Sequence, residues 1–231
     1  MSDIPVITVD GPSGTGKGTV CSYLADWLKW HFLDSGAIYR VLALAAQKRG
    51  IASNNEAALE KLAEDLNVEF KVARAGSLVN VILDGEEVND QIRTENCGNA
   101  ASIIAPIAGV RKALLDRQRA FHKPPGLIAD GRDMGTVVFP DATLKIYLTA
   151  SAEERAKRRH KQLKEQGISA NLRDLSAEIA ARDERDSNRP VSPMKPAEDA
   201  IVIDTSDLDI NAVVARISEL VVEKIPDLPK K

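Results

Sequence analysis

Short apolar runs that end at a polar residue or a glycine recur along the chain. Their length and their Val and Ile content are typical of strands buried on both faces of a parallel sheet. Between them lie stretches with apolar residues at helical spacing, such as Val20, Leu24 and Leu28. This alternation predicts an α/β fold with a central parallel sheet and helices on both faces. The predicted strands are 4–9, 31–33, 126–130, 144–149 and 200–204, and the clearest helices are 17–30, 37–49, 110–121 and 210–225.

One segment breaks this alternation. Residues 66–72 alternate apolar and polar side chains with a period of two, as a half-exposed strand does. A turn at Gly76-Ser77, a further strand at 79–83 and a hairpin signal at 84–85 follow it. We therefore expect a small antiparallel unit inserted into the α/β core.

Length and composition are those of a single globular domain. The chain has 231 residues, enough for one domain with an insertion, of which 44% are hydrophobic and 28% charged. The net charge of −3 and the 4% of aromatic residues argue against a nucleic-acid partner. No run reaches the length of a membrane span, the first residues have no signal-peptide pattern, and the two cysteines have no metal or redox spacing. We expect a cytoplasmic protein without a membrane partner, and a monomer because no heptad pattern is present.

The residues between the first predicted strand and its helix form a phosphate-binding motif. Gly11, Gly16 and Lys17 satisfy G-x-x-x-x-G-K directly after a strand and directly before a helix, which is the context that the motif requires. Glycines let backbone N–H groups surround an oxyanion, and the lysine reaches the β- and γ-phosphates. The alternative is a Gly-rich turn without a ligand. The expected ATP-binding residues are Gly11, Pro12, Ser13, Gly14, Thr15, Gly16, Lys17, Gly18 and Thr19.

This motif departs from its strict form at one position. Gly18 follows the lysine where the strict motif has Ser or Thr, and Thr19 comes one residue later. The expected cofactor is Mg²⁺, bound through the ATP phosphates. The sequence leaves open whether Thr19 touches the ion directly or only through its water molecules.

Charged residues also follow the other predicted strands, at the edge where such sheets bind ligands. Ser35 and Arg40 come after the second strand; as alternatives, they are a helix N-cap and a solvated charge. Asp130 ends the third strand as a Walker-B carboxylate does, a position suited to Mg²⁺ or its water molecules. Arg132 and Asp133 follow on the same rim. These residues predict an anion site near the glycine-rich loop.

A stretch towards the C-terminus combines arginine and aspartate. If it is helical, Arg182, Arg185 and Arg189 share one face, and Asp186 lies one turn after Arg182. Such a face binds an anion, or it is a solvated surface with i,i+4 ion pairs. The sequence leaves both interpretations open.

A second basic stretch follows the strand predicted at 144–149. Arg155, Arg158 and Arg159 are neighbours on the surface of a helix. A mobile lid that closes cations over a transferring phosphoryl group requires such a segment. The alternative is a solvated basic helix face.

Together these motifs resemble those of the bacterial cytidylate kinases, which are nucleoside monophosphate kinases. The resemblance extends over essentially the whole chain, and implies a P-loop kinase domain over 1–231 with a CMP-binding insert at about 63–103 and a helical lid at about 153–167. It implies transfer of the γ-phosphoryl group of ATP to CMP or dCMP. The motifs that carry it are GPSGTGKGT at 11–19, LDSGAIYR at 33–40, IADGRDMGTVVFPDA at 128–142 and ARDERDSNR at 181–189.

The resemblance also implies which residues meet the substrates. The expected catalytic residues are Lys17, Asp130, Arg132 and Arg158, although the sequence does not decide which lid arginine contacts the transferring group. The expected CMP-binding residues are Ser35, Arg40, Ser102, Arg111, Arg132, Asp133, Arg182, Asp186 and Arg189. Within this set the four arginines at 40, 132, 182 and 189 face the phosphate, Asp186 the ribose, and Ser102, Arg111 and Asp133 the base. Ser102 and Arg111 rest on the resemblance alone.

Base chemistry favours cytosine at such a site. A carboxylate and an arginine complement its amine donor and its two acceptors, whereas uracil reverses the donor and acceptor order. We therefore expect CMP to be preferred over UMP. Two alternatives remain: a kinase for another small acceptor such as UMP, dTMP or shikimate, and a nucleotide-gated switch or ATPase. The sequence lacks the Asn-Lys-x-Asp motif of a GTP switch, and its four separated arginine-bearing motifs exceed what an ATPase requires.

Overall fold

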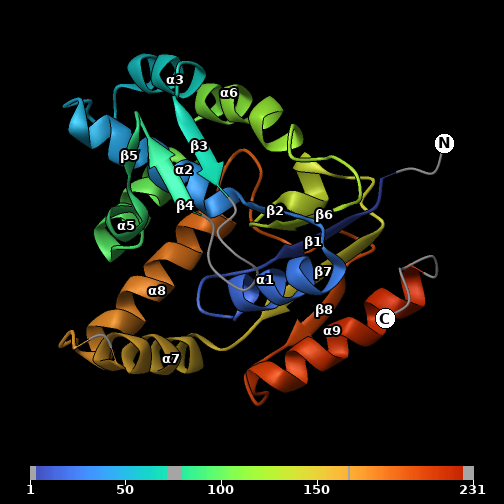
Figure 1. Cartoon of the computed structure of the whole chain (residues 1–231). Helices are drawn as coiled ribbons and strands as arrows, with labels where there is room; N and C mark the ends of the chain where they lie inside the picture. Colours follow the sequence, from blue (N-terminus) through green and yellow to red (C-terminus); the bar gives the residue numbers. More distant parts are fainter. Residues whose placement is uncertain (1–3, 72–79, 166, 226–231) are drawn as a thin grey trace.

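The computed structural model describes residues 4–71, 80–165 and 167–225. At its centre is a parallel sheet of five strands in the order β2-β6-β1-β7-β8 (Figure 1). Each strand matches a predicted one to within two residues at either end, so the predicted parallel α/β fold is confirmed. The strands are β1 (Val6–Asp10), β2 (His31–Asp34), β6 (Leu127–Asp130), β7 (Leu144–Thr149) and β8 (Ile201–Asp204).

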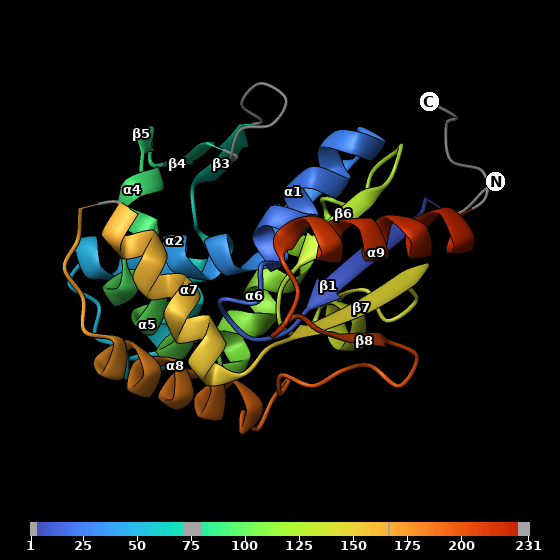
Figure 2. The same cartoon turned by 90° about the horizontal axis from the view of Figure 1, so that it is seen from below.

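Helices cover both faces of this sheet. Because successive side chains of a strand point to opposite faces, Val6 joins one hydrophobic cluster, and Ile7 and Val9 join the other. The first cluster is covered by α2, α3 and α6 and the second by α1 and α9, which lie side by side in Figure 2. The helices are α1 (Lys17–Leu28), α2 (Ser35–Lys48), α3 (Glu56–Glu64), α6 (Ala108–Arg119) and α9 (Ile210–Lys224).

The predicted antiparallel unit is confirmed as a second, three-stranded sheet. Asp84 and Gly85 both have positive φ, at 50° and 85°, as the tight hairpin turn between β4 and β5 requires. The predicted turn at Gly76-Ser77 lies outside the described residues. The unit contains β3 (Val68–Lys71), β4 (Asn80–Leu83) and β5 (Glu86–Glu87), and α4 (Asn89–Ile92) and α5 (Glu95–Ile104) follow it.

Two further helices, α7 (Ala152–Glu165) and α8 (Leu172–Ser187), pack against each other. Figures 1 and 2 both place them at the end of the molecule where α5 and the small sheet lie. The stretch that contains Arg182 and Asp186 is therefore helical, whereas Arg189 lies beyond the end of α8. None of the helices within the described ranges combines the length and the apolar character needed to cross a bilayer.

Candidate active site

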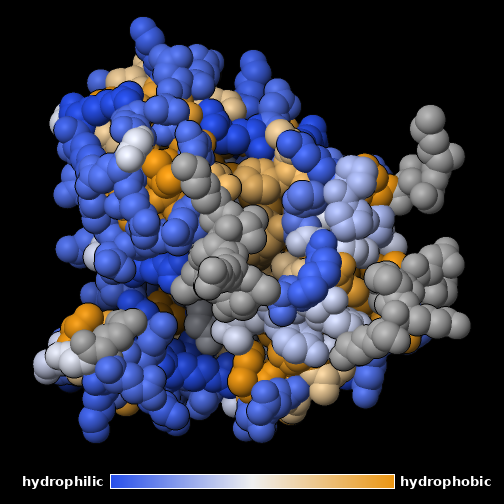
Figure 3. Space-filling view, in the orientation of Figure 1, coloured by the Kyte–Doolittle hydropathy of each residue, from blue (hydrophilic) through white to orange (hydrophobic). Residues whose placement is uncertain are grey.

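A cleft of about 1140 Å³ lies beyond the carboxyl ends of the strands and brings most of the expected site residues together. Figure 3 shows that side chains on one face of the molecule are mostly hydrophilic, with hydrophobic ones in smaller patches. The cleft itself is lined by lysine, arginine and aspartate side chains, which suit a charged ligand. The expected residues that line the cleft are Ser13, Gly14, Gly16, Lys17, Gly18, Thr19, Ser35, Arg40, Ser102, Arg111, Asp130, Arg132, Asp133, Arg182, Asp186 and Arg189.

The glycine-rich loop depends on the absence of side chains at three positions. Gly11, Gly14 and Gly16 have φ values of +135°, +80° and +92°, which other residues rarely adopt. A Cβ at Gly11 would also collide with the carbonyl oxygen of Leu148 in β7. Gly16 is the N-cap of α1, so the loop delivers the chain directly into the first turn of that helix. Its N–H groups and helix terminus form an anion cradle.

Lys17 and Asp130 lie at the base of the cleft. Lys17 is 6% exposed, and its Nζ donates a hydrogen bond to the carbonyl oxygen of Pro12 at 2.6 Å. Asp130 ends β6, and its Oδ2 lies 3.7 Å from the position that a Cβ on Gly18 would occupy. Burial raises the pKa of Asp130 to about 6, and the charge of Lys17 opposes that rise. The pair places a cation and a carboxylate beside the loop.

Asp186 joins three parts of the chain around a buried carboxylate. It is 2% exposed, and it accepts hydrogen bonds from Ser102 Oγ on α5 at 3.0 Å and from Arg132 Nε after β6 at 3.0 Å. Arg189 Nη2 also donates to it. Burial opposes ionisation, yet Arg132 and Arg189 hold the pKa of Asp186 below its ordinary value. One carboxylate therefore orients several side chains of the expected CMP site.

The arginines of this cluster outnumber the carboxylates that they contact. Arg40 and Arg182 meet beside Gly98, where a Cβ would lie 3.4 Å from Arg182 Nη1 and 3.6 Å from Arg40 Nη2. The Nε atoms of Arg182 and Arg189 are buried, and no group in the described part of the chain accepts a hydrogen bond from them. Burial and the nearby charge of Arg132 lower the pKa of Arg182 to about 10. Buried donors and excess positive charge together fit a phosphate.

Arg111 and Asp133 form a buried ion pair on the wall of the cleft. Arg111 also donates to Ser192 Oγ at 3.1 Å and to the carbonyl oxygen of Ala105 at 3.2 Å. Its guanidinium lies over the Tyr39 ring, 5.7 Å from the centroid. These contacts fix the orientation of an arginine beside a carboxylate, the combination expected for the base.

Ser35 does not cap its helix, so the alternative interpretation of this residue is wrong. Asp34 is the N-cap of α2, and its carboxylate accepts a hydrogen bond from Ala37 N at 2.9 Å. Ser35 is buried instead, and its Oγ donates to Gln118 Oε1 at 2.7 Å. It lines the cleft with Arg40.

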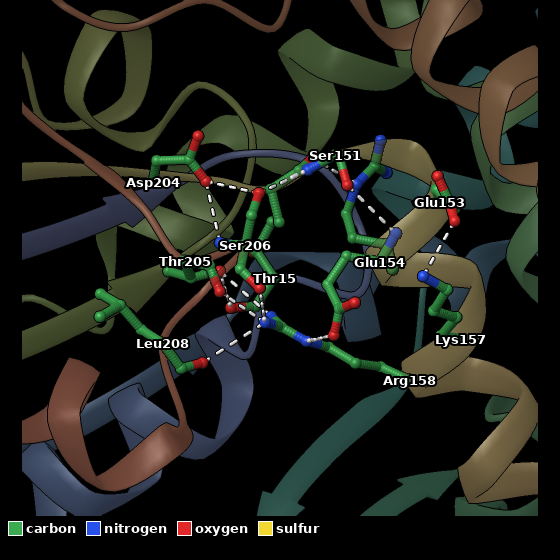
Figure 4. Close-up of polar contacts among 12 residues, drawn as sticks. Thr15, Ser151, Glu153, Glu154, Lys157, Arg158, Asp204, Thr205, Ser206 and Leu208 are labelled. Atoms are coloured by element: carbon green, nitrogen blue, oxygen red, sulfur yellow. Dashed lines mark hydrogen bonds and ion pairs between the residues drawn. The ribbon is translucent and has the colours of Figure 1, made fainter.

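The structure does not bring Arg158 to the cleft. Its guanidinium donates to the Oγ1 and carbonyl oxygen of Thr205, at 3.1 and 2.5 Å, and pairs with Glu154 at 3.2 Å (Figure 4). In this arrangement Arg158 ties α7 to the loop between β8 and α9. Arg158 is not among the residues that line the cleft, and the catalytic role expected for it stays a prediction.

The two neighbouring arginines have other partners. Arg155 is 4% exposed and donates to the carbonyl oxygens of Ser13 at 3.2 Å and Ala150 at 2.9 Å, while its Nη2 pairs with Asp183 of α8. Arg159 lines the cleft and pairs with Glu95 of α5 at 2.5 Å. Of the three arginines of the predicted lid, Arg159 therefore reaches the cleft in this structure.

Comparison with known proteins identifies the family of this chain. Residues 7–223 match the family model described as cytidylate kinase. The chain belongs to the cytidylate kinase family. A relative from Nitrosococcus oceani named cytidylate kinase is 61% identical over 93% of this chain and 95% of its own length. Another of that name, from Stutzerimonas stutzeri, is 58% identical over 97% of this chain and 98% of its own.

Structural comparison supports the fold alone. A crystal structure of an uncharacterized protein from Eubacterium ventriosum has a TM-score of 0.51 with 9% identity, over 95% of this chain and 99% of that one. At this identity the likeness extends to the arrangement of sheet and helices and not to the site. The family assignment therefore rests on the sequence relatives.

In this member of the cytidylate kinase family, sequence reasoning missed three buried polar residues at or beside the site. Tyr39 and Gln118 lie on predicted helices, where nothing in the pattern distinguishes them from ordinary helix residues. Asp10 did have a signal, because it ends an apolar strand just as Asp130 does. Its carboxylate is buried directly before the glycine-rich loop and was not among the expected site residues.

Proposed function

We propose that this chain transfers the γ-phosphoryl group of ATP to CMP or dCMP, giving ADP and CDP or dCDP. The observation that carries the proposal is a cleft lined both by a phosphate-binding loop and by a cluster of arginines. These arginines outnumber the carboxylates that they contact. One phosphate site serves the donor and the other the acceptor. The family and the relatives named cytidylate kinase support cytidylate as the acceptor.

At the donor half, the N–H groups of the glycine-rich loop and the ammonium group of Lys17 bind the ATP phosphates. Lys17 exchanges its hydrogen bond to Pro12 for the phosphate oxygens. An oxygen of the CMP phosphate attacks the γ-phosphorus in line, and the bond to the oxygen bridging the β- and γ-phosphates breaks. The attacking group is already an anion, so the reaction requires positioning and charge neutralisation rather than a strong base.

At the acceptor half, Arg40, Arg132, Arg182 and Arg189 bind the CMP phosphate, and Asp186 binds the ribose. Asp186 also keeps Arg132 and Arg189 in place before the substrate arrives. Bidentate binding by planar guanidinium groups fixes the direction of the attacking oxygen.

The acceptor base is held at a separate wall of the cleft. Ser102, Arg111 and Asp133 read cytosine, since a carboxylate accepts from its exocyclic amine and an arginine donates to its acceptors. Asp133 already pairs with Arg111, and Tyr39 and Ser192 hold that guanidinium. Both base-reading groups are therefore oriented before CMP binds.

The residues beside the loop fit Mg²⁺ bound chiefly through phosphates. Within the described ranges no group of three or more His, Cys, Asp or Glu side chains could hold a metal ion. Mg²⁺ keeps several water molecules and binds nucleotides through phosphate oxygens and one or two carboxylates, so Asp130 and Thr19 would hold the ion or its water molecules here. When bound, the ion neutralises charge on the β- and γ-phosphates.

The pH dependence of ATP use tests the donor site. Burial and the charge of Arg132 lower the pKa of Lys17 to about 8, with Asp130 opposing them. Lys17 carries its positive charge below that pH and loses it above. We expect kcat/KM for ATP to fall above pH 8, approaching tenfold per pH unit, because kcat/KM reports ionisations of the free enzyme. A steady-state pH profile measures this fall.

The matched variant for this profile is Lys17→Arg, whose guanidinium keeps its charge at all these pH values. The variant is expected to be slower and to lose the break near pH 8. A break that persists in Lys17→Arg assigns the ionisation to another group and contradicts this role of Lys17.

A panel of acceptors tests the proposed function itself. The purified chain is incubated with Mg·ATP and, separately, CMP, dCMP, UMP, dTMP, AMP, GMP or shikimate, and ADP release is followed. We expect rapid release with CMP and dCMP and slow release with all others. Release that is equally fast without an acceptor indicates an ATPase, and rapid release with a different acceptor indicates another small-molecule kinase.

A further inference from the structure

Asp10 is a buried carboxylate at the end of β1, one residue before the glycine-rich loop. It is 5% exposed, and each of its oxygens accepts a hydrogen bond from the backbone. Met134 N donates to Oδ1 at 2.9 Å, and Gly135 N donates to Oδ2 at 2.8 Å. Both donors belong to the first turn of the short π-helical segment η1 (Met134–Val138). Asp10 therefore binds a piece of chain that is far from it in sequence.

This piece of chain directly follows two expected site residues, Arg132 and Asp133. Before them, Gly131 N donates a hydrogen bond to the carbonyl oxygen of Val9 at 3.1 Å. After them come the two amides that Asp10 holds. The end of β1 thus fixes the segment on both sides of Arg132 and Asp133.

Close packing makes this attachment specific. A Cβ at Gly135 would lie 2.8 Å from Thr8 Oγ1 and 3.2 Å from Lys145 Cδ. Glycine at this position lets the backbone approach β1 and β7 closely enough for its amide to reach Asp10. With the segment seated on the sheet, Arg132 points to Asp186 and Asp133 to Arg111.

We propose that Asp10 is a positioning residue for the acceptor: by holding the amides of Met134 and Gly135, it sets Arg132 and Asp133 for the phosphate and the base of the nucleoside monophosphate. This inference rests on the proposed function for the identity of the acceptor. Asp10 touches neither substrate. It acts through the backbone, so its effect falls on the acceptor half of the cleft, although the residue next to it begins the donor loop.

The two amides also affect the ionisation of Asp10. Burial, together with the negative charges of Asp133 and Asp130, raises the pKa of this carboxyl to about 7. The hydrogen bonds from Gly135 and Met134 are the groups that lower it. The segment that Asp10 positions thus favours the ionised form of Asp10, which is the form that accepts both hydrogen bonds.

Asp10→Asn and Asp10→Ala test the proposal in the full chain. Asparagine keeps one acceptor oxygen and turns an NH₂ group towards the other amide, whereas alanine removes both acceptors. We expect KM for CMP to rise about tenfold in Asp10→Asn and about a hundredfold in Asp10→Ala, as for the loss of one and two charge-assisted hydrogen bonds. KM for ATP is expected to change less than twofold. The matched control is Asp209→Asn, whose carboxylate also accepts a backbone N–H, from Ala212 at 2.8 Å, at the start of α9.

Two measurements separate positioning from a purely structural role. Thermal unfolding reports stability, and calorimetric titration with CMP alone reports acceptor affinity in the folded fraction. An equal rise of both KM values assigns Asp10 to the donor loop, and a lower melting temperature with unchanged CMP affinity makes it structural; either result overturns the proposal. If Asp10→Ala does not fold, Asp10→Asn decides. If wild type prefers another acceptor in the panel, the proposed function fails, and the same comparison is made with that acceptor.

Discussion

Lys17→Met is expected to lower kcat/KM for ATP by about 10⁴-fold, comparable with the loss of other cations that neutralise a transferring phosphoryl group. Methionine retains most of the side-chain volume and removes the charge. Lys17 is 6% exposed, and its Nζ has a backbone oxygen of the loop itself as its present partner, so it is already at the phosphate cradle. Because the charge grows on the oxygens during transfer, kcat falls along with affinity.

The Lys17→Met change also removes the positive charge beside Asp130, and that charge lowers the pKa of Asp130. Asp130 therefore binds a proton more readily in Lys17→Met, which adds to the loss. Steady-state kinetics with varied ATP at saturating CMP measure the effect. Lys112→Met is the control, since Lys112 is exposed on α6. A Lys17→Met enzyme within tenfold of wild type would show that the donor phosphates bind elsewhere.

The second large effect concerns the base of the acceptor. We expect kcat/KM for CMP to exceed that for UMP by about 10⁴-fold, because a site that hydrogen-bonds its substrate leaves buried groups unpaired with the wrong one. Asp133 is 3% exposed and pairs with Arg111, so neither group can turn to water when uracil binds. UMP turning over as fast as CMP contradicts this assignment.

Asp133→Asn tests which residue carries the discrimination. It removes the negative charge at nearly constant shape and leaves the Arg111 guanidinium without its carboxylate. We expect CMP turnover to fall by about 10²-fold or more and UMP turnover to change far less, so that the preference shrinks. Asp116→Asn, an exposed position on the helix that carries Arg111, is the matched control. An unchanged preference in Asp133→Asn assigns base reading to other residues.

Most of the core fold was predictable from the sequence, for a physical reason. Strands buried on both faces of a parallel sheet must be short and apolar, as β1 and β6 are, and the intervening helices keep one apolar stripe. Helices α4 and α5 were not predicted, because their apolar residues are spread among Asn, Gln and Ser. The π-helical turn after Asp133 depends on the distant Asp10 and leaves no periodic signal.

The candidate site was predictable where a charged residue lies at the end of a predicted strand or next to a glycine. Asp130, Arg132 and Lys17 stand out on this ground, and all three line the cleft. Ser102 and Arg111 lie on helices as ordinary polar residues, so only the family resemblance selects them. Helical spacing placed the three lid arginines on one surface, but tertiary partners such as Thr205, in another part of the chain, decide where each guanidinium points.

The buried guanidinium of Arg155 has a thermodynamic consequence. It contacts Ser13 in the donor loop and Asp183 in the helix that carries Arg182 and Asp186. One side chain therefore contacts both the donor half and the acceptor half of the cleft. Thermodynamic linkage makes this coupling reciprocal. If bound ATP changes the affinity for CMP by some factor through this contact, bound CMP changes the affinity for ATP by the same factor.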